Sequence, residues 1–110
     1  LEARRDWGFA GDYVKAMWAM LQQDEPRDYV VATGRTISVA DFCRMACEAG
    51  GLDFQKHVES DSAFMRPAEV ELLCGDASKA KVELGWEPQV QVEQLVEMMV
   101  RRDLERYGVK

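Results

Sequence analysis

The sequence lacks several features that would place a particular chemistry on it. It has one histidine and three cysteines, and Cys43 and Cys47 stand at helical spacing rather than in a metal-binding pattern. A structural zinc site needs four nitrogen or sulfur ligands, so we expect no metal site. No apolar run approaches the roughly 20 residues that a membrane helix requires, and no basic, apolar leader opens the chain. These absences predict a soluble, cytoplasmic polypeptide.

Positive charge is also scarce. The 110 residues include 14 Lys and Arg against 20 Asp and Glu, which gives a formal net charge of -6. Such a field repels polyanions, so the composition excludes wholesale binding to a nucleic-acid backbone. A small anionic ligand is still compatible with it, because paired guanidinium groups act at short range. The length fits a single domain over residues 1–110.

Signatures of a cofactor site and of catalysis are missing as well. A dinucleotide site needs a glycine-rich turn between a strand and a helix, so that backbone N–H groups approach the pyrophosphate. Gly8 and Gly11 precede a predicted helix, but no strand-forming run comes before them. None of the three tyrosines has a lysine four positions later, and there is no serine-hydrolase elbow. We therefore predict that this chain holds no catalytic residue.

Apolar periodicity and capping residues predict four helices. Ser38 and Asp41 resemble a capping box, Asp76 is placed to cap a short helix, and Gly11 or Asp12 to cap the first. Gly85 ends the third helix, as the pair Gly50-Gly51 ends the second. Apolar residues recur at three- and four-residue steps over 12–23, 39–49, 77–84 and 92–104.

Strand signals are short and few. Tyr29 to Thr33 is β-branched and bounded by Asp28 and Gly34, so we predict a strand buried on both faces. A weaker strand is predicted over 52–58, and 70–74 should be extended or irregular. The result is a small α/β piece with four helices and two or three short strands. Its three Trp and six Met exceed what a piece of this size can cover, so we expect an apolar face turned toward a missing domain or subunit.

Two charged clusters could recognise an anionic ligand. In Arg66-Pro67-Ala68-Glu69 the guanidinium matches phosphate oxygens, and the carboxylate can accept hydrogen bonds from vicinal sugar hydroxyls. The cluster Arg4-Arg5-Asp6 offers a second cationic site, in which the aspartate can hold one guanidinium. A surface salt bridge and a solvated charge cluster are the ordinary alternatives.

Three blocks of sequence resemble a known family. They are ARRDWGFAGDYVKAMWAMLQQ at 3–23, YVVATGRTISVADF at 29–42 and MRPAEVELLCGDASKAKVELGWEP at 65–88. In this order they resemble the extended short-chain dehydrogenase/reductases, and most closely the GDP-mannose 4,6-dehydratases. The resemblance implies a C-terminal, mostly helical, sugar-nucleotide-binding subdomain, from which the NADP-binding Rossmann core is absent.

The resemblance also implies roles for individual residues. Arg5 and Arg66 would approach the diphosphate of a GDP-sugar such as GDP-mannose, and Glu69 would contact the ribose. Trp7 and Asp6 would orient Arg5 and pack the loop. NADP, the catalytic residues and the partner Rossmann region would lie upstream, in a protein that is expected to be a homo-oligomer.

Alternatives stay open at this point. The family reaction oxidises C4 of the hexose, eliminates water across C5 and C6, and yields GDP-4-keto-6-deoxymannose. Between Phe54 and Phe64 the loop is shorter than is usual for the group, which leaves room for a GDP-4-keto-6-deoxymannose reductase or a nucleotide-sugar epimerase. A non-catalytic interaction module that presents the Met- and Trp-rich faces is the alternative from another class.

Overall fold

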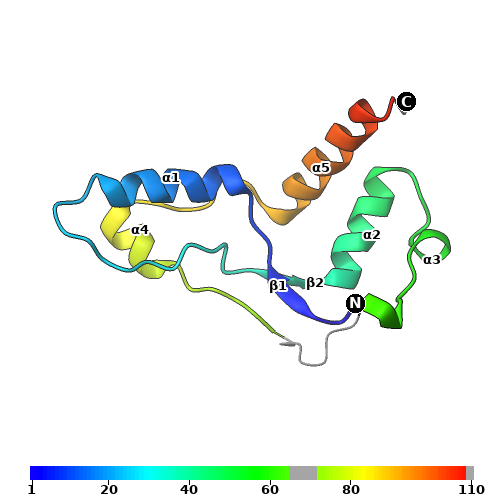
Figure 1. Cartoon of the computed structure of the whole chain (residues 1–110), viewed down its shortest axis with the longest axis horizontal. Helices are drawn as coiled ribbons and strands as arrows, with labels where there is room; N and C mark the ends of the chain where they lie inside the picture. Colours follow the sequence, from blue (N-terminus) through cyan, green and yellow to red (C-terminus); the bar gives the residue numbers. More distant parts are fainter. Residues whose placement is uncertain (65–71, 109–110) are drawn as a thin grey trace.

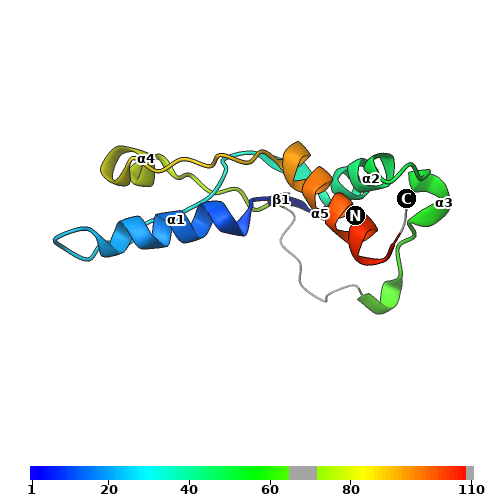
Figure 2. The same cartoon turned by 90° about the horizontal axis from the view of Figure 1, so that it is seen from above.

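The computed structural model describes residues 1–64 and 72–108, which form an elongated molecule of 52 × 37 × 19 Å. Helices α1 and α4 lie together at one end, α2, α3 and α5 lie at the other, and a small sheet joins them (Figure 1). The view from above shows how thin the molecule is (Figure 2). The elements in chain order are β1 (Arg4–Asp6), α1 (Ala10–Leu21), β2 (Thr36–Ser38), α2 (Val39–Ala49), α3 (Phe54–His57), a 3-10 turn (Ser62–Phe64), α4 (Ser78–Leu84) and α5 (Val92–Arg106).

The four helices predicted from the sequence are confirmed, and most of their ends follow local chemistry. The Ser38 hydroxyl accepts a hydrogen bond from Asp41 N at 3.0 Å and so caps α2. The Asp76 carboxylate accepts from Ser78 N at 2.9 Å just before α4, and Gly85 ends that helix in the left-handed region with φ of 67°. Helix α1 differs, because it begins at Ala10 and no side chain caps it.

Asp12, predicted as a candidate cap, has another role. Its side chain is buried, and its carboxylate accepts backbone hydrogen bonds from Gln89 N at 3.1 Å and Val90 N at 3.0 Å. Its carbonyl oxygen accepts a hydrogen bond from Trp86 Nε1 at 2.8 Å. Asp12 therefore ties the start of α1 to the segment that links α4 with α5.

The predicted strands were wrong. The segment 29–33 pairs with no strand among the described residues, and only alternate side chains, including Val31, pack against the α1–α4 core, while Val30 is exposed. Over 52–58 a short helix forms instead of a strand. The Asp53 carboxylate accepts a hydrogen bond from Gln55 N, which starts α3.

The sheet forms where charged sequence gave no strand signal. Strand β1 pairs antiparallel with β2, with Arg5 opposite Ile37. On the other side of β1, Leu72 forms a parallel bridge with Arg4, and Leu73 N donates to the Arg4 carbonyl at 3.0 Å. Three segments that are far apart in sequence therefore meet at β1.

Two apolar clusters hold the ends of the molecule. Ala16 of α1, Ala80 of α4 and Trp86 form the first. Val92, Leu95 and Val96 of α5 are buried at the other end, where α5 packs against α2. Nowhere in the described ranges is there a helix long and apolar enough to cross a membrane.

Candidate substrate-binding site

The Asp6 carboxylate is the main polar junction beside β1. Its Oδ1 accepts hydrogen bonds from Thr33 N at 2.9 Å and Thr33 Oγ1 at 2.6 Å. Its Oδ2 accepts from Gly34 N at 2.8 Å and Gly75 N at 3.3 Å. Asp6 therefore fastens two loops, one after the 29–33 segment and one before α4, to the end of β1.

Arg5, the described member of the predicted site, lies in the middle of β1. It is half-buried, and its Nη1 donates to the Arg4 carbonyl at 2.7 Å. The guanidinium of its neighbour Arg4 is held by Thr36, through the carbonyl oxygen at 3.1 Å and the hydroxyl at 3.4 Å. Arg66 and Glu69, the other two predicted binding residues, lie outside the described residues.

Trp7 supports β1 from the side of α2. Its ring stacks on Phe42 with centroids 4.2 Å apart, and its Nε1 donates to the Ile37 carbonyl at 3.2 Å. The expectation that Trp7 and Asp6 pack this loop is thus confirmed. Their effect on the orientation of Arg5 stays a prediction.

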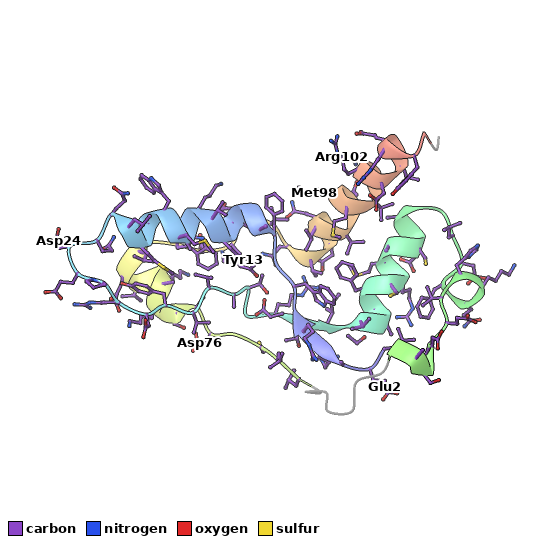
Figure 3. The ribbon with its side chains drawn as sticks, in the orientation of Figure 1. Glu2, Tyr13, Asp24, Asp76, Met98 and Arg102 are labelled. Atoms are coloured by element: carbon purple, nitrogen blue, oxygen red, sulfur yellow. The ribbon has the colours of Figure 1, made fainter. Side chains whose placement is uncertain are left out.

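Tyr13 fills the space behind the same loop. Burial raises the pKa of its phenol above the ordinary value, and the nearby carboxylates of Asp6 and Asp12 raise it further. The side chain projects from α1 on the side toward Asp76 (Figure 3). Tyr13 packs against the cluster of Ala16, Ala80 and Trp86.

A cleft of about 550 Å³ opens beside the Asp6 junction. Sequence reasoning missed it, because its walls come from three segments that only the folded chain brings together. Lys81 is the one cation among its lining residues, and its Nζ lies 3.7 Å from Glu87 Oε2. Arg5 is not among those residues, which are Ala32, Thr33, Gly34, Gly75, Asp76, Ala77, Ser78, Lys81, Trp86, Glu87, Pro88 and Gln91.

The described glycine turn at Gly8 and Gly11 does not fit a dinucleotide. A strand does precede Gly8 and Gly11, contrary to the prediction, so the order of strand, glycine turn and helix is present. However, a Cβ added at Gly8 would overlap the Tyr13 phenol, and one at Gly11 would overlap the Phe9 ring. The space beside both glycines is therefore filled by the chain itself, and no room is left for a pyrophosphate.

Metal ligands are not assembled either. Within the described part of the chain, no three His, Cys, Asp or Glu side chains are grouped so that they could hold a metal ion. His57 is exposed, and its Nδ1 lies 2.8 Å from the Asp53 carbonyl within α3. His57 therefore makes a local surface contact.

Comparison with known proteins decides the family. The sequence model of the GDP-mannose 4,6 dehydratase family matches residues 1–99. The chain belongs to this family. It is 56% identical over 105 residues to GDP-mannose 4,6 dehydratase 1 of Arabidopsis thaliana and 42% identical over 125 residues to the enzyme of Homo sapiens. Both alignments cover 96% of this chain, which spans only 29% and 33% of those two relatives.

Solved structures show the same fold. A dTDP-glucose 4,6-dehydratase of Bacillus anthracis in complex with NAD matches with a TM-score of 0.84 and 19% identity. A UDP-glucose 4-epimerase of Thermotoga maritima with UDP-glucose matches with a TM-score of 0.83 and 26% identity. Each match covers 96% of this chain and 33% of the other. The fold is thus shared with one part of larger sugar-nucleotide enzymes.

The alignments also show that family members differ in length over the region that this chain covers. Two alignments each cover 96% of this chain but differ in length. The alignment with the Vibrio cholerae enzyme is 133 residues long, and that with the Arabidopsis relative is 105 residues long. Some family members therefore carry extra residues, and others have the compact form seen here. A short form of this region therefore does not favour a reductase or an epimerase over a dehydratase.

Proposed function

We propose that this chain is the sugar-nucleotide-binding part of a GDP-mannose 4,6-dehydratase. The full-length protein would convert GDP-mannose to GDP-4-keto-6-deoxymannose with loss of water. In this proposal Arg5 and Arg66 bind the diphosphate, and Glu69 binds the ribose. The identity to curated dehydratases over nearly the whole chain supports the activity, since these relatives carry that name.

The geometry at β1 supports the site. Leu72 comes three residues after Glu69 in the sequence, and it bridges Arg4, the neighbour of Arg5. The chain that leaves the Arg66–Glu69 segment therefore continues directly alongside β1. Arg4 and Leu72, which lie far apart in sequence, meet at one strand, and this single observation supports the proposed assignment of the site.

The exposed surface supports a chain that packs against further protein. Its accessible area is 8406 Å², whereas a compact monomer of 12.5 kDa would expose about 6,200 Å². Its radius of gyration is 16.8 Å, against about 13 Å for a compact domain of this length. Excess surface of this size matches an interface within a larger enzyme.

The remaining chemistry is assigned to the rest of the protein. Because the described glycine turn is filled by Tyr13 and Phe9, NADP would be bound by a Rossmann region outside residues 1–110. The catalytic residues would lie there too. We also propose a homo-oligomer in the cytoplasm, which size-exclusion chromatography of the full-length protein and cell fractionation would test.

The proposal is tested on the full-length protein with GDP-mannose and NADP. We expect a 4-keto product, and in Arg5→Ala a KM for GDP-mannose raised about 10- to 100-fold, the loss expected for hydrogen bonds to a charged group. Arg101→Ala is the matched control, since Arg101 is exposed on α5 and, among the described residues, pairs only with Glu97 of its own helix. Its KM should stay within twofold of the wild type.

Other outcomes would redirect the assignment. Turnover of a different nucleotide sugar, with none of GDP-mannose, would overturn the dehydratase proposal and favour a reductase or an epimerase. Absence of binding to GDP or GDP-mannose by the full-length protein would overturn the site itself and favour an interaction module.

A further inference from the structure

We propose that Asp6 is the positioning residue that holds residues 72–75, which follow the proposed Arg66–Glu69 segment in sequence, against β1 beside Arg5, although it touches no substrate itself. This inference rests on the proposed function, because it names how that site is held together. It goes beyond the expected loop packing by assigning Asp6 a specific effect on sugar-nucleotide affinity.

The first observation is the set of donors around the carboxylate. Each oxygen accepts two hydrogen bonds, which come from three residues on two loops. Three of the four donors are backbone N–H groups, so the contacts fix the path of the chain at Thr33, Gly34 and Gly75. A carboxylate suits this position, since it offers acceptors on both oxygens, whereas an amide would turn an NH₂ group toward two N–H donors.

The second observation is the close packing at Gly75. A Cβ added there would overlap the Cβ of Ala32, which is buried and has no freedom to move aside. The glycine therefore lets the extended chain after Leu72 approach the 29–33 segment closely enough for Gly75 N to reach Asp6. The packing of Gly75 against Ala32 and the hydrogen bond from Gly75 N to Asp6 both require the two segments to lie this close.

The third observation is that these contacts lie next to Arg5 in β1 and on residues 72–75, which come shortly after Glu69 in the sequence. Asp6 follows Arg5 directly in β1. On the other segment, Leu72 bridges Arg4 and Leu73 N donates to the Arg4 carbonyl, so Gly75 is held at Asp6 and Leu72 at Arg4. The segment is thus fastened at two points along β1, and its register beside Arg5 is set. A shift of about 1 Å between binding groups can cost up to a hundredfold in function.

The experiment uses full-length Asp6→Asn protein. We expect its Kd for GDP-mannose to rise about tenfold, while its Kd for NADP stays within twofold of the wild type. Asp12→Asn is the matched control, because Asp12 also accepts two backbone hydrogen bonds but ties α1 to the 86–90 segment instead of to the loops at β1. It should lower thermal stability to a similar extent and leave both Kd values within twofold.

Two further variants allow the same test if the Asp6→Asn protein fails to fold. Thr33→Val removes the hydroxyl donor to Oδ1, together with the acceptor for Arg35 N at 3.2 Å, and should weaken GDP-mannose binding about threefold. Gly75→Ala, which forces Gly75 away from Ala32 and Asp6, should again weaken it about tenfold without a change in NADP affinity. The positioning role would be overturned if these variants lost affinity for GDP-mannose and NADP equally. It would also be overturned if Asp12→Asn lost as much GDP-mannose affinity as Asp6→Asn.

Failure of the function and failure of the inference give different results. If the wild-type protein binds NADP but not GDP-mannose, the proposed function fails, and the inference fails with it. If the wild type binds both ligands and Asp6→Asn binds GDP-mannose with unchanged affinity, only the positioning role fails.

Discussion

At the residue scale, burial of a charged group depends on distant partners. Asp12 accepts hydrogen bonds from residues 77 and 78 positions away, so no local sequence window could have assigned its role. Ser38, in contrast, caps α2 through a residue three positions away, and that cap was predicted correctly. Asp6 combines both cases, since its motif drew attention but its four donors come from segments that only the folded chain brings near.

Removal of the Asp12 carboxylate should expose this dependence. In Asp12→Ala the N–H groups of Gln89 and Val90 lose their acceptor, and because both hydrogen bonds are only partly buried, each loss should cost about 1 kcal/mol. We expect faster amide hydrogen exchange at these two residues in the full-length protein, together with a lower Tm. Asp61→Ala is the control, because Asp61 is exposed and accepts only from Ala63 N within its own turn. A wild-type exchange pattern in Asp12→Ala would contradict the assigned role.

At the element scale, helices were predictable and strands were not. The helical stripes follow from spacing within one segment, and α2, α4 and α5 begin close to where their caps and apolar residues predict. The β1 strand carries two arginines and an aspartate, so its composition gave no strand signal. It forms because pairing with β2 and Leu72 satisfies its backbone, while the apolar 29–33 segment finds no partner strand among the described residues.

The packing of α5 provides a test at this scale. Val96 is only 2% exposed at the contact with α2, so Val96→Ala should lower the free energy of unfolding by roughly 1–3 kcal/mol. Val82 offers the same substitution on α4 at 83% exposure, and Val82→Ala should stay within about 0.5 kcal/mol. Thermal melting of both variants checks the difference. Equal losses in the two variants would contradict the burial of α5.

An ion pair between elements should make stability depend on pH. Arg35 Nη1 donates to Glu93 Oε2 at 2.8 Å and so ties the chain before β2 to α5. This hydrogen bond lowers the pKa of Glu93 below its ordinary value. The pair therefore stabilises the fold above the unfolded pKa of the carboxyl, and this contribution is lost as pH falls through the lower folded pKa.

Glu93→Gln isolates that contribution. The Tm difference from the wild type should be small, because both side chains are about half exposed, and largest at neutral pH and low salt. It should vanish in acid, below the folded pKa of Glu93. Glu97→Gln, which alters an exposed pair within α5, should show a smaller difference at neutral pH. A Tm difference for Glu93→Gln that grows as pH falls would contradict the sign of the shift.

At the scale of the whole molecule, the exposed apolar face of α1 is the feature that needs a partner. Val14, Met17, Trp18 and Leu21 lie on one stripe and are between 55% and 81% exposed. The sequence predicted such a face from its Trp and Met content, but not its place, because the inner face of α1 is set by contacts with α4 and Trp86. A stripe of this kind on an elongated molecule indicates a packing surface.

Polar substitutions in that stripe should improve the behaviour of the isolated fragment and destabilise the full-length protein. Trp18→Gln together with Leu21→Gln should reduce self-association of isolated residues 1–110, since it removes the apolar surface that drives it. In the full-length protein the same pair should lower stability by about 3–6 kcal/mol, at roughly 1.5–3 kcal/mol for each side chain that is buried there. Lys15→Gln, on the same helix but off the stripe, should change neither property. Chromatography of the fragment and melting of the full-length protein measure the two effects, and a full-length Tm unaffected by the double substitution would mean that α1 faces water in the complete enzyme.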